Sequence, residues 1–500
     1  MYLNLFTTIT VFALQTVINF FLTPYILRVL GDEAYGFLAL ANSFVNYGFI
    51  LTLVINSVAS RFIASAYHKG NFTKASKFYS SVLMANLIFS VIVAFISFIF
   101  LLKIQSIINI SNALLDDVRA TMAIYFINFS IGLFNAIFSV HAFIKNQMYL
   151  ISIRNAISTT IYAGCVLWLF WAFEAMIYYT AIAALISSIF VFFSALVLNH
   201  KFGLNLIFSP KYFRINFIKV LARSGLFNSL NMLSQVLLSG ASLLLVNIFI
   251  NALSMGTLAI SRSVIMIVES FVITTAVAWD PRLVQIHANA KPLKDEAILA
   301  IKSVSFIALP LIATFGVLAD EFYRLWLPFK SSDEIDYIYE LVLISLLPSI
   351  IFASSRPLIS TYLITDRLKR PALVTLFMAV CVFCVQIIGL AFFNFGLKEI
   401  VMTITIGISL KITLFDVANA GVNLGLKFST FYPIYFKSLG VFVLIIAIIY
   451  PFSNILNISN WLEFLIYAVA ISTLGYLIAF MIIFTKEQRA IFIGKIRGRF

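Results

Sequence analysis

Charged residues are scarce in this sequence. Asp, Glu, Lys and Arg make up 11% of the 500 residues, against about 25% in an average soluble protein. Hydrophobic residues make up 62%, and a water-soluble fold of this length could not bury so much apolar surface. The composition therefore excludes a soluble protein and predicts a chain that crosses a membrane many times.

Cysteine and histidine are scarce as well. The three cysteines, Cys165, Cys381 and Cys384, lie inside apolar runs, so no disulfide framework is available. The four histidines stand singly near the ends of such runs. We therefore expect no metal site, no cofactor and no redox chemistry.

Apolar runs long enough to cross a bilayer follow one another along the chain. A span needs about 20 mostly apolar residues, and helix is the only state that satisfies the backbone in lipid without a closed barrel. These runs predict an all-α polytopic membrane protein with about 14 transmembrane helices. The expected spans are residues 3–27, 37–59, 79–101, 120–140, 155–173, 177–198, 224–248, 257–279, 303–319, 340–362, 372–393, 400–424, 438–456 and 462–484.

The basic residues divide unequally between alternate loops. Of the 34 Lys and Arg residues, 25 fall in one set of loops, including Lys291 and the tail residues Lys495, Arg497 and Arg499, and three fall inside spans. The opposite set holds six: Arg28, Lys103, Arg119, Arg324, Lys330 and Lys398. Because cytoplasmic loops carry the basic excess, we expect both termini in the cytoplasm.

This topology also explains the net charge of +14. A soluble protein with such a charge would suggest nucleic acid as a partner, whereas basic cytoplasmic loops suggest anionic membrane lipids. The first span begins at Met1 without a basic n-region, so we expect no cleaved signal peptide.

Two segments of the chain repeat each other at an offset of 220 residues. Gly, Leu, Ala and Ser recur in register between residues 36–43 and residues 256–263. The copies lie six spans apart, an even number, so they share one orientation, as in parallel-repeat transporters. We therefore expect two pseudo-symmetric six-helix lobes around a central cavity. The expected divisions are an N-terminal lobe (1–198), a basic cytoplasmic linker (199–223), a C-terminal lobe (224–424), and two further helices with a basic tail (425–500).

Two motifs near the N-terminus resemble a known family of transporters. The sequence LGDEAYG at residues 30–36 and NSVASRFIA at residues 56–64 resemble the polysaccharide transporters of the multidrug/oligosaccharidyl-lipid/polysaccharide (MOP) flippase superfamily, particularly the O-antigen flippases of the Wzx type. The resemblance implies that an undecaprenyl-diphosphate-linked oligosaccharide moves from the cytoplasmic to the periplasmic leaflet by alternating access. It also implies a polysaccharide polymerase and a chain-length regulator as partners.

The resemblance further implies roles for two arginines. Similar flippases place arginines in the cavity to meet the diphosphate, and by position Arg262 and then Arg61 would inherit this role. The sequence departs from the related lipid II flippases in one respect. Those proteins carry arginines within the first span, whereas this first span has only Arg28, at its outer end.

Five charged residues lie well inside the expected spans: Arg262, Glu269, Arg356, Lys411 and Asp416. Each costs about 2.5–3.5 kcal/mol at the centre of a span, so they must face a wet cavity or one another. Arg262 and Glu269, seven apart, share a helix face, whereas Lys411 and Asp416 lie about 140° apart on an α-helix and need not pair. The excess cation suits a diphosphate bound by Arg262, Arg356 and Lys411. Glu269 and Asp416 are then candidates for coupling to H⁺ or Na⁺. The alternative is buried ion pairing, for instance of Glu269 with Arg356 or Lys411.

Uncharged polar residues form stripes on three spans. Asn228, Asn231 and Gln235 recur at i, i+3 and i+7, which marks one helix face and adds them to the candidate substrate-binding residues. Gln15 with Asn19, and Asn42 with Asn46, recur at i, i+4. These stripes favour a wet interior, and the alternative is hydrogen bonding between helices.

Two other functions compete with the flippase. A multidrug exporter, or an exporter of another lipid-linked precursor, would share the superfamily fold. A membrane-embedded polymerase or glycosyltransferase would need acid–base groups, but no paired carboxylates stand in a common loop with a nearby base, and no histidine lies inside a span. The sequence thus predicts a transporter rather than an enzyme.

Overall fold

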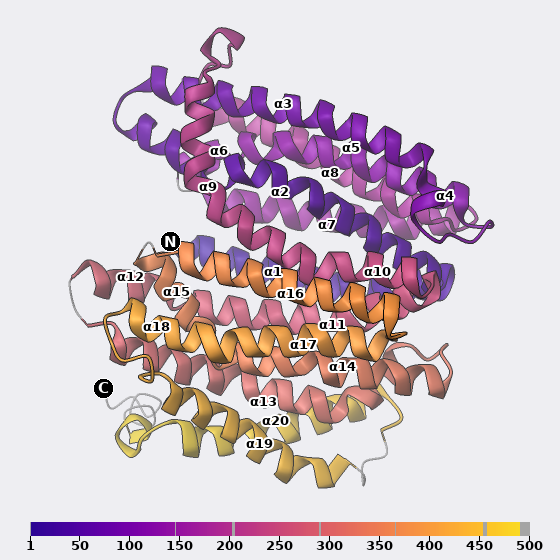
Figure 1. The fold of residues 1–500 in the computed structure, drawn as a ribbon, viewed down its shortest axis with the longest axis vertical. Coiled ribbons are helices and arrows are strands. Elements are labelled where there is room, and N and C mark those ends of the chain that lie inside the picture. Colours follow the sequence, from indigo (N-terminus) through magenta and orange to yellow (C-terminus); the bar gives the residue numbers. More distant parts are fainter. Residues whose placement is uncertain are drawn as a thin grey trace. The chain divides into compact units, whose positions relative to one another are not determined.

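The computed structural model of the chain describes residues 2–145, 147–202, 206–289, 292–365, 367–453 and 458–490, and within these ranges every regular element is a helix (Figure 1). Lys291, Lys495, Arg497 and Arg499, assigned above to the cytoplasmic side, lie outside the described residues. So do residues 203–205 of the expected linker and the last three residues of the expected span 438–456.

The helices follow the apolar runs of the sequence. In chain order they are α1 (Tyr2–Leu30), α2 (Asp32–His68), α3 (Phe72–Leu102), α4 (Ile104–Ile107), α5 (Leu115–Phe138), α6 (Val140–Ile144), α7 (Met148–Ala172), α8 (Ile177–Phe202), the 3₁₀ turn η1 (Pro210–Tyr212), α9 (Ile215–Gln235), the π segment η2 (Val236–Gly240), α10 (Ala241–Phe249), α11 (Ala252–Val277), α12 (Asp280–Ala288), α13 (Lys294–Trp326), α14 (Ser332–Ala353), α15 (Arg356–Ile364), α16 (Lys369–Phe392), α17 (Leu397–Leu410), the π segment η3 (Lys411–Asp416), α18 (Val417–Asn423), α19 (Tyr432–Ser453) and α20 (Trp461–Ile483).

Thirteen helical stretches of the described chain are long and apolar enough to cross a membrane, and α2 makes a fourteenth if its two halves count as one span. This confirms the fold class predicted from hydropathy, a polytopic all-α membrane protein. The halves of α2 meet at a 61° bend between Ile50 and Thr52. Thr52 Oγ1 donates to the carbonyl of Phe49 at 3.0 Å, and such side-chain bonding into the ladder bends helices.

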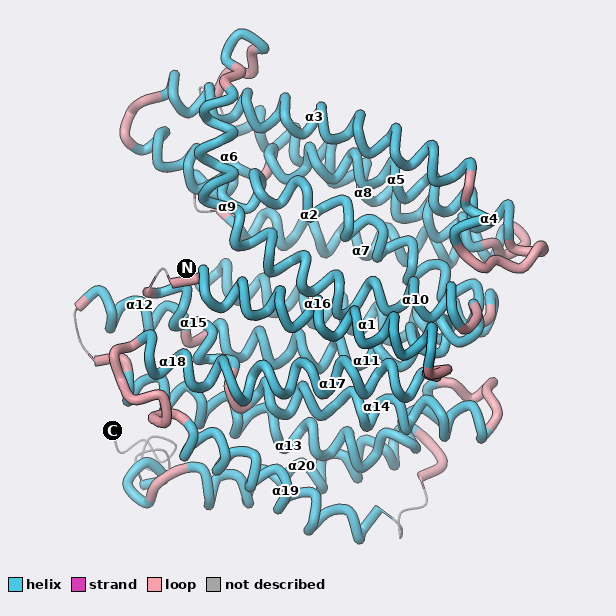
Figure 2. The backbone as a smooth tube through the Cα atoms, viewed as in Figure 1, coloured by secondary structure: helices cyan, strands magenta, loops and turns pink. Residues whose placement is uncertain are grey.

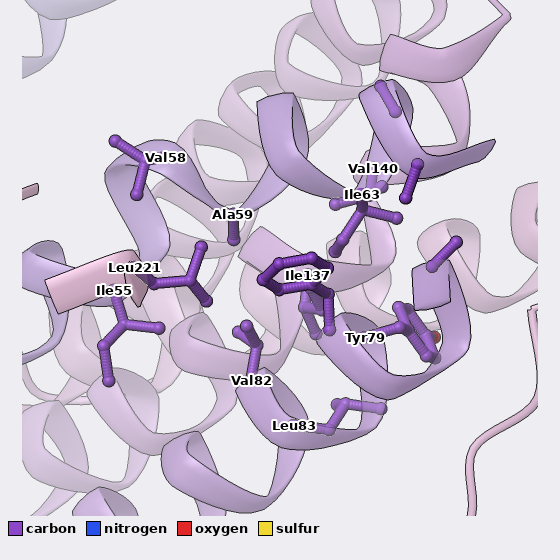
Figure 3. Close-up of a cluster of buried hydrophobic side chains, with 14 of the residues drawn as sticks. Ile55, Val58, Ala59, Ile63, Tyr79, Val82, Leu83, Ile137, Val140 and Leu221 are labelled. Atoms are coloured by element: carbon purple, nitrogen blue, oxygen red, sulfur yellow. The ribbon is translucent and has the colours of Figure 1, made fainter. Parts of the chain in front are cut away.

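The chain divides into two compact units, Met1–Ala259 and Ile260–Phe500, and their boundary falls inside α11. In the first unit α3, α5 and α8 run side by side, α1 packs on α7, and α2 packs on α3, α5 and α9 (Figure 1). Its core joins apolar side chains of α2, α3, α5 and α9, among them Ile55, Val82, Ile137 and Leu221 (Figure 3). The helix α9, expected to open the second lobe, thus packs along α2 here, and the division into lobes stays a prediction.

The second unit is organised around α13. This helix packs against α14, α15, α19 and α20 (Figure 2), and its inward face is lined by small and aliphatic residues. Helix α20 approaches α13 closely at Gly475, where an added Cβ would lie 3.1 Å from Pro310 Cβ. The two C-terminal helices therefore belong to the packed core of this unit.

Candidate functional site

Lys411 and Asp416 form an ion pair inside the second unit. Lys411 Nζ lies 2.7 Å from Asp416 Oδ2, and the Asp416 side chain is only 1% exposed. The α-helical spacing predicted no such pair, but residues 411–416 form the π segment η3. A π turn closes i→i+5 hydrogen bonds, which brings residues five apart onto one face. The extra residue in the turn is the reason that the expected 140° separation was wrong.

Tyrosines from neighbouring helices hold this π segment. The hydroxyl of Tyr362 donates to the carbonyl of Asp416 at 2.8 Å, and the hydroxyl of Tyr432 donates to the carbonyl of Thr413 at 2.7 Å. Such partners satisfy carbonyls that a π turn leaves without regular helical bonds. The segment is therefore a built feature that fixes the Lys411–Asp416 pair.

Arg262, Met266 and Glu269 lie along one face of α11 in the second unit. The helix is continuous over Ala252–Val277, so the seven-residue spacing keeps Arg262 and Glu269 on one side, and the two charges interact. Met266 between them is 65% exposed. Arg262 and Glu269 are half-buried, so this face of α11 carries a cation and an anion with one exposed side chain between them.

Arg356 lies at a helix start rather than inside a span. The expected span 340–362 is interrupted, because α14 ends at Ala353 and α15 begins at Arg356. The guanidinium stacks on the ring of Phe352, with Cζ 5.7 Å from the ring centroid, and the charge of Asp280 acts on it. A hydropathy window averages over so short a break, and for this reason the sequence placed Arg356 in mid-membrane.

The candidate residues of the first unit lie on α2 and α9. Arg61, exposed near the end of α2, has its Cζ 5.8 Å from the ring centroid of Phe62. The polar stripe on α9 contacts α2 at Asn228, whose Nδ2 donates to Ser57 Oγ at 3.3 Å. Asn231 is half-buried, and Gln235, exposed, stands directly before the π segment η2.

Two asparagines far apart in sequence clamp one end of the first unit. Asn109 N donates to Asn247 Oδ1 at 2.8 Å, and Asn247 Nδ2 donates back to the carbonyl of Asn109 at 3.0 Å. Asn109 Nδ2 also reaches the carbonyls of Asn247 and Ile248. In the same unit the backbone N–H of Ser111 donates to Glu33 Oε1 at 3.2 Å. Sequence reasoning missed this clamp, since nothing local marks a pair 138 residues apart.

A basic pocket lies at one end of the second unit. It has a volume of about 440 Å³, and its wall includes His287, Lys294 and Arg367. A neighbouring pocket of about 260 Å³ shares Arg367 and adds Arg370. No acidic side chain of the described residues lines either pocket. The sequence identified Lys294, Arg367 and Arg370 only as parts of separate loops expected to be cytoplasmic, and the fold gathers them.

No group of three or more His, Cys, Asp or Glu side chains among the described residues is placed to hold a metal ion. The chemistry that this arrangement offers is charge pairing and hydrogen bonding inside apolar spans. Such groups are expensive in lipid and mark substrate or ion pathways.

Comparison with known proteins places this arrangement in a transporter fold. The MatE family model matches residues 8–158. A Bacillus subtilis (strain 168) protein described as "Uncharacterized membrane protein EpsK" is 27% identical over 99% of this chain and 98% of its own length.

Solved structures match at lower identity but over most of the chain. The lipid II flippase MurJ in an inward closed conformation superposes with a TM-score of 0.72 at 16% identity, covering 96% of this chain and 98% of its own. An inward-facing multidrug resistance MATE family transporter of the MOP superfamily gives 0.67 at 13% identity, covering 84% and 98%. The chain therefore has the fold of these solved structures.

Proposed function

We propose that this protein is a flippase that carries undecaprenyl-diphosphate-linked oligosaccharide repeat units of O-antigen or a similar surface polysaccharide. It would move them from the cytoplasmic to the periplasmic leaflet by alternating access. The observation that carries the proposal is the near end-to-end match of the fold to a lipid II flippase. The match covers 96% of this chain, so the residues outside it are fewer than those of α19 and α20 together. These two helices must therefore largely lie within the match.

Charges in the second unit support a diphosphate as the group recognised. Arg262 is half-buried on α11, one turn from the exposed Met266, and the planar guanidinium fork matches phosphate geometry. We assign the diphosphate to Arg262 first, with Arg61, Arg356 and Lys411 as further contacts. Asn228, Asn231 and Gln235 would meet polar parts of the substrate.

Each of the intramembrane cations has an acidic neighbour in its own unit. Glu269 acts on Arg262, and Asp416 pairs with Lys411. A carboxylate that alternates between pairing with a cation and binding H⁺ or Na⁺ would release the diphosphate on the outer side. We therefore propose ion coupling through Glu269, with Asp416 as the second candidate.

The proposed setting is the inner membrane of a bacterium, with both termini in the cytoplasm and two lobes at residues 1–198 and 224–424. Anionic membrane lipids, a polysaccharide polymerase and a chain-length regulator are the proposed partners. Reporter fusions after Asn199 and Lys369 test the orientation, because both should report cytoplasm.

A second candidate is a multidrug exporter, or an exporter of another lipid-linked precursor, which the MatE match over residues 8–158 favours. Depletion of the protein in its host separates the candidates. A flippase predicts that lipid-linked oligosaccharide accumulates with its glycan facing the cytoplasm and that surface glycan is lost. A drug exporter predicts unchanged surface glycan and increased sensitivity to organic cations.

A further inference from the structure

A polar pocket lies inside the first unit, halfway along three apolar helices. Its volume is about 380 Å³, and it is lined by Gln15 and Asn19 of α1, Ser158, Thr159 and Tyr162 of α7, and Ser187 of α8. All three helices have the length and composition of membrane spans. Six polar side chains therefore converge where lipid would otherwise demand apolar ones.

Hydrogen bonds between helices shape the walls of this pocket. Gln15 Nε2 donates to Thr159 Oγ1 at 3.1 Å, and Ser158 Oγ donates to the carbonyl of Ser187 at 3.4 Å. Asn19 is exposed at the same wall. Because an exposed amide at mid-span is costly against lipid tails, the pocket must open to water.

Tyr162 adds an aromatic ring to the pocket wall. Tyr125 of α5 and Tyr35 of α2 lie near this ring, and Asn42 of α2 lies beside Tyr125, which is itself buried. Asn42 is exposed on α2, and it belongs to one of the stripes seen in the sequence. Aromatic rings beside amides and hydroxyls are the groups that bind sugars, since rings cover the C–H faces and amides serve the hydroxyls.

None of the six lining residues carries a charge. A diphosphate or a coupling ion would need charged groups, so this pocket suits neither. Amides and hydroxyls both donate and accept hydrogen bonds, as sugar hydroxyls require. The volume falls in the range of small-molecule sites, about 300–1,000 Å³.

We propose that this pocket binds an uncharged, hydroxylated sugar residue of the lipid-linked oligosaccharide and so selects which glycan is exported. The inference rests on the proposed flippase function and adds a glycan subsite separate from the cations that meet the diphosphate. Hydrogen bonding between α1, α7 and α8 alone would need neither a cavity of this size nor an exposed amide.

The test compares two substrates in proteoliposomes of the full chain. One is undecaprenyl diphosphate carrying the host's own repeat unit, and the other, the short lipid, is undecaprenyl diphosphate without any sugar. Thr159→Val should lower the flipping rate of the native lipid about three- to tenfold, the effect of one lost hydrogen bond, while the short lipid keeps its rate. Thr159→Ser, which restores the hydroxyl, should recover the wild-type ratio of the two rates.

The neighbouring threonine supplies the matched control. The hydroxyls of Thr159 and Thr160 each donate to the carbonyl four residues earlier. Thr160 is exposed but does not line the pocket. Thr160→Val should therefore keep the wild-type ratio of the two rates. If Thr159→Val slows both lipids equally or neither, the pocket is interhelical bonding only and the inference fails. If the wild-type protein moves neither lipid, the proposed function itself fails, and the inference falls with it.

Discussion

Gly36 and Gly256 meet backbone to backbone in the first unit. A Cβ on Gly36 would lie 2.8 Å from the amide nitrogen of Gly256, and a Cβ on Gly256 would lie 2.1 Å from the carbonyl oxygen of Asp32. These are the first residues of the two segments that repeat at an offset of 220 in the sequence. Positions matched by the repeat thus lie together near the starts of α2 and α11. The charge pattern predicts that the loops beside them are on the periplasmic side.

This close approach predicts that Gly256→Ala loosens the packing of α2 against the start of α11. Overpacking of this kind costs about 1–3 kcal/mol, which shifts a two-state equilibrium by about 5- to 150-fold. A cysteine at Met255, which is fully buried, should then react faster with an impermeant maleimide in a background without the native cysteines. Gly164→Ala is the control, because nothing lies within 4 Å of its added Cβ. Equal labelling in both variants would show that the glycine contact does not keep position 255 buried.

The Lys411–Asp416 pair predicts a distinctive pattern of stability. Removing one partner leaves a buried charge uncompensated, at a cost of about 3–5 kcal/mol, whereas replacing both with apolar residues is close to neutral. Lys411→Met and Asp416→Leu alone should therefore lower the melting temperature of the purified protein, and the double variant should recover it. The double variant should still fail to flip substrate, since neither charge remains. Full flipping by the double variant would mean that the pair is purely structural.

Arg262 is predicted to act on substrate rather than on folding. Arg262→Ala should reduce glycan export about 10- to 100-fold, as expected for a lost hydrogen bond to a charged group, while membrane abundance stays near normal. Arg262→Lys should recover only part of the export, because a point charge replaces the bidentate fork. Arg214→Ala is a control, since that exposed side chain bonds only nearby carbonyls. Loss of the protein from the membrane with normal activity per molecule would instead indicate a structural ion pair.

Glu269 is predicted to couple transport to inward H⁺ or Na⁺. The membrane potential assists the outward movement of negative charge by about 2.3 kcal/mol per charge per 100 mV, and an ion gradient would add to it through this carboxylate. Glu269→Gln should flip more slowly and lose its response to the ion gradient. A wild-type rate that still responds to the gradient would exclude Glu269 as the coupling site.

Hydropathy was enough to predict most of the spans, because a helix in lipid must be apolar over its length wherever it lies in the fold. Local departures from the α-helix were harder to predict. The break before Arg356 lies next to Pro357, and helices tend to end just before a proline, whereas the π turn from Lys411 to Asp416 is held by Tyr362 and Tyr432 of neighbouring helices. Both departures changed where a candidate charge lies.

Contacts between residues far apart in the sequence could not be predicted either. The Asn109–Asn247 clamp joins residues that no periodicity connects, and the basic pocket near Arg367 gathers loops that the sequence reads separately. The stripe of Gln15 and Asn19 was visible, but its partners on α7 and α8 were not. The sequence therefore predicts which helix faces are polar, but only the structure shows which of these faces line a pocket.

The most direct test of the account is flipping in proteoliposomes that hold the lipid-linked oligosaccharide. A membrane-impermeant lectin would report the glycan that reaches the opposite leaflet, with the ion gradient and the potential set separately. We expect translocation by the wild-type protein to accelerate with an inward ion gradient and a negative-inside potential, and to be about 10- to 100-fold slower in Arg262→Ala. Translocation that responds to neither gradient nor potential would reduce the protein to a downhill scramblase. No translocation by a folded wild-type protein would contradict the central claim.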